Sequence, residues 1–409
     1  MQAVSTIHVK EVKGGNFLTP KGFLAAGVEA GVKNDKKDVG IIISEVPANC
    51  AAVYTTNQFQ AAPIKVSKES IAKEGLIQAV IVNSGCANAC TGEQGLQDAY
   101  ETRSLVAQKF NIKEHLIAVA STGVIGVNLP MEKIADGIKQ LNPGNEQENA
   151  VAFQTAILTT DTMMKTSCFT AEINGHTVTM GGTAKGSGMI HPNMATMLAF
   201  ITTDANVDQS GLQAALSEIT ETSFNQITVD GDTSTNDTVF VLANGKADHE
   251  SLTPEHDDWP VFVELLAMTC ESLAKQIARD GEGATKLIEV EVKGAVNDLD
   301  ARMIAKQIVG SSLVKTAVYG ADANWGRIIS ALGQTKTAVN TENVDISIGS
   351  IEMLKGSVPL TFSEEAALEY LQKDFIQIFV DLHNGDSSGK AWGCDLSYDY
   401  IKINASYRS

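Results

Sequence analysis

A glycine-rich segment runs directly into an apolar, strand-like stretch near the middle of the chain, and this junction constrains both fold and chemistry. The glycines lie between residues 181 and 188, and the apolar stretch covers residues 197–201. Residues 189–196, which end in Ala195-Thr196, connect the two. Because such an apolar stretch is typical of a core strand, we expect Thr196 to open a buried strand, with its β-branched side chain stiff at χ1.

The hydroxyl of Thr196 is suited to attack the carbonyl of the small residue before it. Attack on Ala195 gives an ester through an N-to-O acyl shift, and hydrolysis of the ester frees a chain that begins with Thr196. That terminus carries a nucleophile and an α-amine base on one residue. The amine titrates at about pH 7.7–8.0, where a general base is useful. On the pattern alone, a threonine that only opens a strand is the commoner case.

The segment Lys185-Gly-Ser-Gly-Met-Ile-His-Pro-Asn-Met-Ala-Thr196-Met-Leu-Ala resembles the ornithine acetyltransferase family, the bifunctional glutamate N-acetyltransferases of the cyclic arginine pathway. Residues 83–92, 230–238 and 319–327 extend the resemblance over nearly the whole chain. Two departures stand out. Cys86 replaces a frequent Asn, and Met163-Met164 replace a segment that often carries Pro before Lys165.

The resemblance implies that the precursor cuts itself between Ala195 and Thr196, and that Thr196 becomes the acyl-carrying nucleophile. It implies that Thr122 and Gly123 form the oxyanion hole, the donors that an acyl-transfer site needs. By itself Ser-Thr-Gly after a strand is more often a turn, although the missing side chain of Gly123 permits close approach. The residues that it implies as substrate contacts are Thr162, Lys185, Thr196, Glu282, Asn404 and Ser409.

The residue types at these positions fit substrates that carry carboxylates and an amine. Lys185 can pair with a carboxylate, although a lone lysine in a glycine-rich loop is usually a solvated charge. Glu282 lies between two glycines, an unusual place for a merely solvating charge. A terminal segment such as 404–409 is normally frayed, so an ordered one would be unusual.

The family function implied is ping-pong acetyl transfer from N-acetylornithine to glutamate, giving ornithine and N-acetylglutamate in arginine biosynthesis. Acetyl-CoA is a possible co-substrate, and neither a bound cofactor nor a metal is expected. The cleaved chains, residues 1–195 and 196–409, are expected to assemble as an α2β2 heterotetramer. Two rival classes stay open: a self-processing hydrolase in which water takes the acyl group, and a non-enzymatic binding protein for acidic amino acids.

Hydrophobic residues make up 44% and charged residues 20% of the 409 residues, enough for a large core. Strands are predicted near residues 76–82, 116–120, 197–202, 238–242, 286–292 and 344–348, with a hairpin at 168–180 that turns on Asn174-Gly175. Helices are predicted near residues 94–109, 149–158, 210–222, 260–279 and 298–309. The irregular alternation favours α+β layers. The resemblance implies an α/β layered fold with an N-terminal threonine nucleophile, and the only boundary we recognise is the chemical one at 195/196.

Charge and cysteine content exclude other classes. A net charge of −18 argues against nucleic acid or an anionic membrane as partner. No apolar run approaches the length of a transmembrane helix, and the first residues lack a signal-peptide pattern. Six cysteines in a chain of this length are not typical of a disulfide framework, so a cytoplasmic location is expected.

Four other site interpretations are weaker. The loop from Asp230 has Thr235 and Val241 where a calcium-binding EF-hand needs glycine and glutamate, so we interpret it as a hydrogen-bonded turn at the site wall. Cys86 and Cys90 are expected to be buried small hydrophobes and not metal ligands. His191 is expected to be part of the loop structure, because the nucleophile brings its own amine. Residues 182–187 lack the order of a phosphate-binding P-loop.

Overall fold

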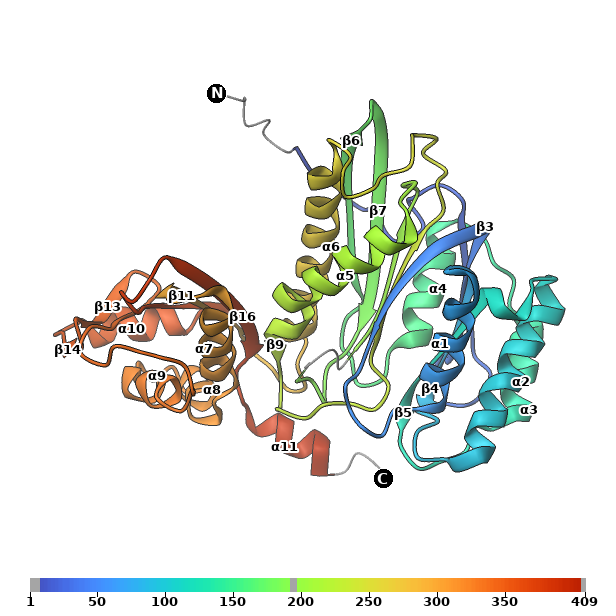
Figure 1. Cartoon of the computed structure of the whole chain (residues 1–409). Helices are drawn as coiled ribbons and strands as arrows, with labels where there is room; N and C mark the ends of the chain where they lie inside the picture. Colours follow the sequence, from blue (N-terminus) through green and yellow to red (C-terminus); the bar gives the residue numbers. More distant parts are fainter. Residues whose placement is uncertain (1–7, 192–196, 406–409) are drawn as a thin grey trace.

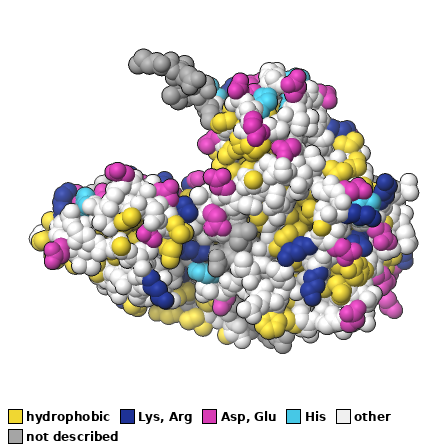
Figure 2. All heavy atoms as spheres, in the orientation of Figure 1, with side chains coloured by type: hydrophobic (Ala, Val, Ile, Leu, Met, Phe, Trp, Pro, Cys, Tyr) yellow, Lys and Arg dark blue, Asp and Glu magenta, His cyan; other side chains and the backbone are white. Residues whose placement is uncertain are grey.

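The protein is built on two β-sheets, each with helices packed against it (Figure 1). The structure, a computed structural model, describes residues 8–191 and 197–405. Strands and helices mix along the chain as the sequence predicts, and the α/β layered class is confirmed. Acidic side chains are spread over both lobes on the face that Figure 2 shows, in keeping with the net charge of −18.

Within the described residues, the larger sheet has nine strands in the order β1-β6-β7-β8-β10-β3-β4-β5, with β2 paired to β3 as well. Their bounds are β1 (Lys10–Glu11), β2 (Phe23–Val28), β3 (Val39–Tyr54), β4 (Leu76–Cys86), β5 (Ile117–Val124), β6 (Lys165–Ile173), β7 (His176–Lys185), β8 (Leu198–Thr203) and β10 (Thr238–Ala243). The pairs β8·β10 and β4·β5 are parallel, and the other pairs are antiparallel.

Helices cover both faces of this sheet because its strands are apolar on both sides. They are α1 (Ala62–Glu74), α2 (Gly92–Phe110), α3 (Met131–Gln140), α4 (Gln147–Ile157), α5 (Gln209–Thr222) and α6 (Trp259–Arg279), with short 3-10 turns η1 (Glu114–Leu116) and η2 (Phe224–Gln226). Successive residues of β8 point to opposite faces. Phe200 packs against Phe153 of α4, with ring centroids 5.4 Å apart, whereas Ile201 joins the cluster that contains Leu273 of α6.

The smaller sheet has seven strands among the described residues, in the order β14-β13-β12-β15-β11-β16-β9. Their bounds are β9 (Ile227–Thr228), β11 (Leu287–Ala295), β12 (Asp345–Ile348), β13 (Ile351–Lys355), β14 (Val358–Pro359), β15 (Phe375–Asp381) and β16 (Ser387–Cys394). Its own core includes α7 (Asp298–Gly310), α8 (Ser312–Tyr319), α9 (Trp325–Leu332) and α10 (Glu364–Leu371). The last helix, α11 (Tyr398–Ala405), leads back toward the larger sheet (Figure 1).

Helix α6 joins the two lobes. Trp392 of β16 packs in the same buried cluster as Leu273 of α6, and Lys275 lies 3.6 Å from the carboxylate of Glu289 on β11. The lobes therefore share a continuous apolar contact. In the described ranges, no helix is long and apolar enough to cross a bilayer.

The predicted hairpin is confirmed: Ile173 pairs with His176, and Asn174 and Gly175 both have positive φ, 50° and 74°. The sequence interpretation missed the division between the two sheets, which comes where β11 begins except that the short strand β9 already belongs to the smaller sheet. The expected chemical boundary lies elsewhere, in the connection between neighbouring strands β7 and β8, where Lys185 pairs with Leu198. Strands from both sides of residues 195/196 thus belong to one sheet.

Candidate active site

A cavity of about 270 Å³ opens where the ends of β5 and β7 meet the start of β8. Five of the residues implied by the resemblance line it together: Thr122, Gly123, Lys185, Glu282 and Asn404. Met197, the residue after Thr196, lines it too. Ala195, Thr196 and Ser409 lie outside the described residues.

The wall formed by Thr122 and Gly123 depends on the close approach of two backbones. Gly123 lies opposite Gly85 of the parallel strand β4 and has φ +133°, a conformation that disfavours any side chain. A Cβ atom at Gly123 would lie 2.3 Å from the carbonyl carbon of Gly85. Glycine is therefore required here for the strand ends to meet.

The loop after Asp230 forms another part of the wall, as the sequence indicates. Ser234, Asn236 and Asp237 line the cavity. The side-chain amide of Asn236 donates to the carbonyl oxygens of Ala87 (2.5 Å) and Ser121 (2.9 Å). Because Ser121 immediately precedes Thr122, this amide fixes the end of β5 against the cavity.

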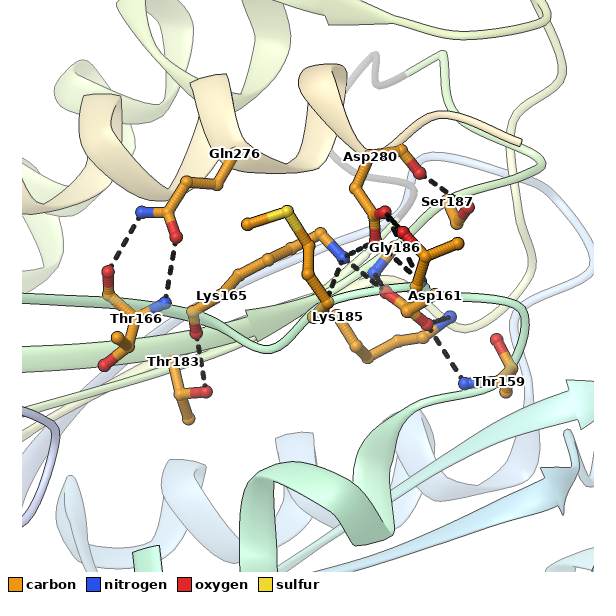
Figure 3. Close-up of polar contacts among 12 residues, drawn as sticks. Thr159, Asp161, Lys165, Thr166, Thr183, Lys185, Gly186, Ser187, Gln276 and Asp280 are labelled. Carbon is orange, nitrogen blue, oxygen red and sulfur yellow. Dashed lines mark hydrogen bonds and ion pairs between the residues drawn. The ribbon is translucent and has the colours of Figure 1, made fainter. Parts of the chain in front are cut away.

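Lys185 lies next to Asp161 in a buried group of charged residues that also contains Lys165 and Asp280 (Figure 3). Its ammonium nitrogen is 3.8 Å from Oδ2 of Asp161, whose side chain is fully buried. Burial alone would raise the pKa of Asp161, but the ammonium groups of Lys185 and Lys165 outweigh that effect and hold the pKa below its ordinary value. Asp161 is therefore a carboxylate across the physiological range.

The loop that follows Lys185 is anchored along its length. The amide of Gly186 donates to Asp161 (2.6 Å), and the hydroxyl of Ser187 donates to the carbonyl of Asp280 (2.7 Å). Further on, the carboxylate of Asp230 accepts hydrogen bonds from the amides of Met189 (2.6 Å) and Ile190 (2.8 Å). The approach to residue 191 is thus fixed by groups from three separate parts of the chain.

Glu282 is 5% exposed and brings a carboxylate to the cavity. Its Oε2 accepts a hydrogen bond of 2.7 Å from the side-chain amide of Asn404, which comes from α11. A Cβ atom on Gly188 would lie 2.3 Å from the carboxyl carbon of Glu282, so the glycine leaves room for that carboxylate. The segment that carries Asn404 is an ordered helix up to Ala405.

The structure places Thr162 against Asp280. Its backbone amide and its hydroxyl both donate to the carboxylate of Asp280. Thr159 and Thr160, from the same segment, line the cavity, and Thr162 does not. A substrate contact for Thr162 stays a prediction. Three of the four residues 159–162 are threonines, so the sequence alone does not indicate which of them face the cavity.

His191 and Cys90 complete the comparison with the expectations. His191 Nδ1 lies 2.9 Å from the hydroxyl of Thr228, and burial together with Lys306 lowers its pKa to about 4. It therefore carries no charge at neutral pH and packs as part of the loop.

The two cysteines that could have started a metal site differ in burial. Cys86 is buried as expected, whereas Cys90 is exposed just before α2, so the expectation that Cys90 is buried was wrong. No cluster of metal-ligating side chains occurs in the part of the chain that the structure describes.

Known proteins match this chain over almost its whole length. The model of the ArgJ family matches residues 24–409. The arginine biosynthesis bifunctional protein ArgJ of Geobacillus kaustophilus is 65% identical over 404 residues, 99% of this chain and 98% of the relative. The protein of the same name from Halalkalibacterium halodurans is 62% identical over 405 residues, again 99% and 98% of the two chains.

A solved structure gives the same result. The crystal structure of arginine biosynthesis bifunctional protein argJ from Bacillus halodurans is 65% identical, with a TM-score of 0.51, and covers 52% of this chain and 100% of the solved chain. The resemblance seen in the sequence is thereby confirmed, and the chain belongs to the ArgJ family of arginine-biosynthesis enzymes.

Proposed function

We propose that this enzyme transfers an acetyl group from N-acetylornithine to glutamate through an ester on Thr196. The observation that carries the proposal is the shared cavity, which Thr122, Gly123, Lys185 and Glu282 line together with Met197, the residue after Thr196. Each group matches one demand of the reaction: donors for an oxyanion, a cation for a carboxylate, and an anion for an ammonium group.

The first step is self-cleavage. The hydroxyl of Thr196 attacks the carbonyl carbon of Ala195, the peptide C–N bond breaks to leave an ester, and water hydrolyses the ester to a free carboxylate and a free α-amine. The anchored loop 186–190 supports this step, because it limits the conformations of the approaching chain. The length of the solved Bacillus halodurans chain also supports it, since residues 196–409 likewise make up just over half of this chain.

The second step is acetyl transfer to the enzyme. The hydroxyl of Thr196 attacks the acetyl carbonyl of N-acetylornithine while the α-amine of Thr196 takes its proton. Thr122 and Gly123 donate to the oxyanion of the tetrahedral intermediate. The C–N bond then breaks, the proton passes to the leaving amine, and ornithine departs from acetyl-Thr196.

The third step returns the acetyl group to an amine. Glutamate enters the same cavity, its amino group attacks the ester carbonyl, and N-acetylglutamate leaves as Thr196 recovers its proton. Lys185 pairs with a substrate carboxylate in both half-reactions, whereas Glu282 pairs with the side-chain ammonium of the ornithine moiety. Asn404 holds the Glu282 carboxylate in place for that contact.

We further propose that acetyl-CoA serves as a second donor, in line with the bifunctional relatives. The products 1–195 and 196–409 assemble as an α2β2 heterotetramer in the cytoplasm, and the chemistry needs neither a bound cofactor nor a metal. Because the family consists of enzymes, the alternative of a non-enzymatic binding protein no longer stands.

The denatured mass of the purified protein tests the nucleophile. We expect the wild type to give two pieces split between Ala195 and Thr196, and Thr196→Ala to remain whole at 43.4 kDa. An intact wild type that still transfers acetyl groups would overturn the free-amine mechanism. Incubation with N-acetylornithine with and without glutamate then separates transfer from hydrolysis, since a hydrolase would release acetate at the same rate in both.

A further inference from the structure

A fully buried lysine contacts the same carboxylate as Lys185. Lys165, the first residue of β6, has a side chain that is 0% exposed. Its ammonium nitrogen is 2.7 Å from Oδ1 of Asp161 and 2.5 Å from Oδ2 of Asp280, and both carboxylates are buried as well (Figure 3). Lys165 therefore bridges two acids that come from different parts of the chain.

Such a group costs stability and calls for an explanation beyond folding. Removing charges from water is expensive, and well-packed apolar residues of similar volume often stabilise a protein as much as a buried ion pair does. Asp280 uses its carboxylate to hold Thr162, and Asp161 uses its own to hold the amides of Thr159 and Gly186. The two acids thus fix the backbone at residues 159–162 and at Gly186, next to the cavity-lining residues Thr159 and Lys185.

Lys185 shares one of these acids with Lys165. At 3.8 Å, Asp161 attracts the Lys185 ammonium without forming a hydrogen bond with it. The buried group thus contains two carboxylates and two ammonium ions, but Lys165 makes the short contacts with both acids. Lys185 remains at the cavity, where it is one of the lining residues.

We propose that Lys165 is a positioning residue that keeps the Lys185 ammonium available for a substrate carboxylate. It does so by neutralising Asp161 and Asp280, which would otherwise draw Lys185 away from the cavity into a close ion pair. The inference rests on the proposed function, in which Lys185 binds the carboxylate of N-acetylornithine and of glutamate.

Removal of the lysine charge tests this assignment. In Lys165→Met, two carboxylates face one ammonium ion, and we expect the KM for N-acetylornithine to rise about tenfold or more, as for loss of a charge-assisted hydrogen bond. The kcat should fall much less, since Lys185 does not touch the reacting carbonyl.

The double variant Lys165→Met/Asp280→Asn separates positioning from a merely structural role. It restores one carboxylate to one ammonium ion, and the remaining amide oxygen can still accept from Thr162. We expect its KM to return to within about threefold of the wild type. If the KM of the double variant is as high as that of the single variant or higher, the proposal is overturned. Should the single variant fail to fold, the same threefold criterion applies to the double variant alone.

Two further variants complete the design. Lys275→Met removes a lysine from the lobe junction, where it pairs with Glu271 and Glu289, and should leave the KM unchanged. Lys185→Met tests the premise. If Lys185→Met leaves the KM unchanged, the carboxylate role in the proposed function fails. If it raises the KM while Lys165→Met does not, only the positioning role of Lys165 fails.

Discussion

The carboxylate of Glu282 accepts a hydrogen bond of 2.7 Å from the side-chain amide of Asn404, although 122 positions separate the two residues. The contact is backed by a second one nearby, in which the hydroxyl of Ser397 donates to the carbonyl of Gly283 at 2.6 Å. Asp395 also accepts from the amides of Thr285 (2.8 Å) and Lys286 (2.9 Å). The end of the chain is thus bound to the loop that presents Glu282.

Truncation of the amide at Asn404 is expected to weaken substrate binding. Asn404→Ala removes a hydrogen bond to a carboxylate, which is worth about 1.5–3 kcal/mol, so the KM for N-acetylornithine should rise about tenfold. Steady-state kinetics measure this. Ile401→Ala, at a side chain 64% exposed on the same helix, is the control and should leave the KM unchanged. An equal rise of the KM in both variants would mean that the fold of α11 matters and the Asn404 side-chain amide has no specific role.

A methyl group at Gly188 should displace the Glu282 carboxylate. The new Cβ atom would lie 2.3 Å from the carboxyl carbon of Glu282, so one of the two must move. We expect Gly188→Ala to raise the KM for N-acetylornithine more than the KM for glutamate, because Glu282 pairs with the ornithine ammonium. Gly326→Ala is the matched control, since its Cβ atom meets nothing closer than 3.4 Å. Equal changes in both KM values would contradict the assigned contact.

Gly123→Ala should act on kcat. Its Cβ atom would lie 2.3 Å from the backbone of Gly85, which forces the oxyanion donors out of position, and loss of one such donor typically costs about 10²–10³ in kcat. Gly126→Ala separates this effect from backbone strain, because Gly126 also has positive φ, 80°, yet its Cβ atom would meet nothing within 4 Å. A kcat that falls equally in both variants would count against an oxyanion role for this turn.

His191 makes the stability of the fold depend on pH. Its pKa in the folded state is about 4, below the ordinary value of 6.5, because burial and Lys306 disfavour the charged ring. Between these values the unfolded state binds more protons, so the stabilising contribution is complete above about pH 6.5 and is lost as the pH falls toward 4. Urea unfolding at pH 7 and pH 4.5 measures this. The free energy of unfolding should fall less between these pH values for His191→Gln than for the wild type. An identical fall in both would mean that groups other than His191 set the pH dependence of stability.

Elements that are specified by a short stretch of sequence could be predicted. Asn174-Gly175 specifies a hairpin because both residues accept positive φ, and the apolar run that became β4 has no alternative but burial. β3 could not be predicted, because its 16 residues include a charged and proline-containing stretch and a register shift between Ile43 and Ala48. Several strand pairs of the smaller sheet, such as β11 with β15 and β9 with β16, join segments far apart in sequence, which local patterns do not encode.

The site divides in the same way. Lys185 and Glu282 stand out against glycines, and the structure brings them to one cavity. Asn236 could not be assigned, because its partners Ala87 and Ser121 are more than a hundred positions away. Lys165 was also missed, since a lysine at the start of a strand ordinarily faces water. Its burial is explained by Asp161 together with Asp280, and Asp280 lies 115 positions away in the sequence.

The strand order has a consequence for anyone who would make the two pieces separately. β8 lies between β7 and β10, and β10 lies between β8 and β3, so a cut before residue 196 leaves two strands of the second piece inserted among strands of the first. Each piece alone would expose unpaired strand edges across the middle of the sheet. A gene divided at this point should therefore yield soluble protein only when both halves are produced together.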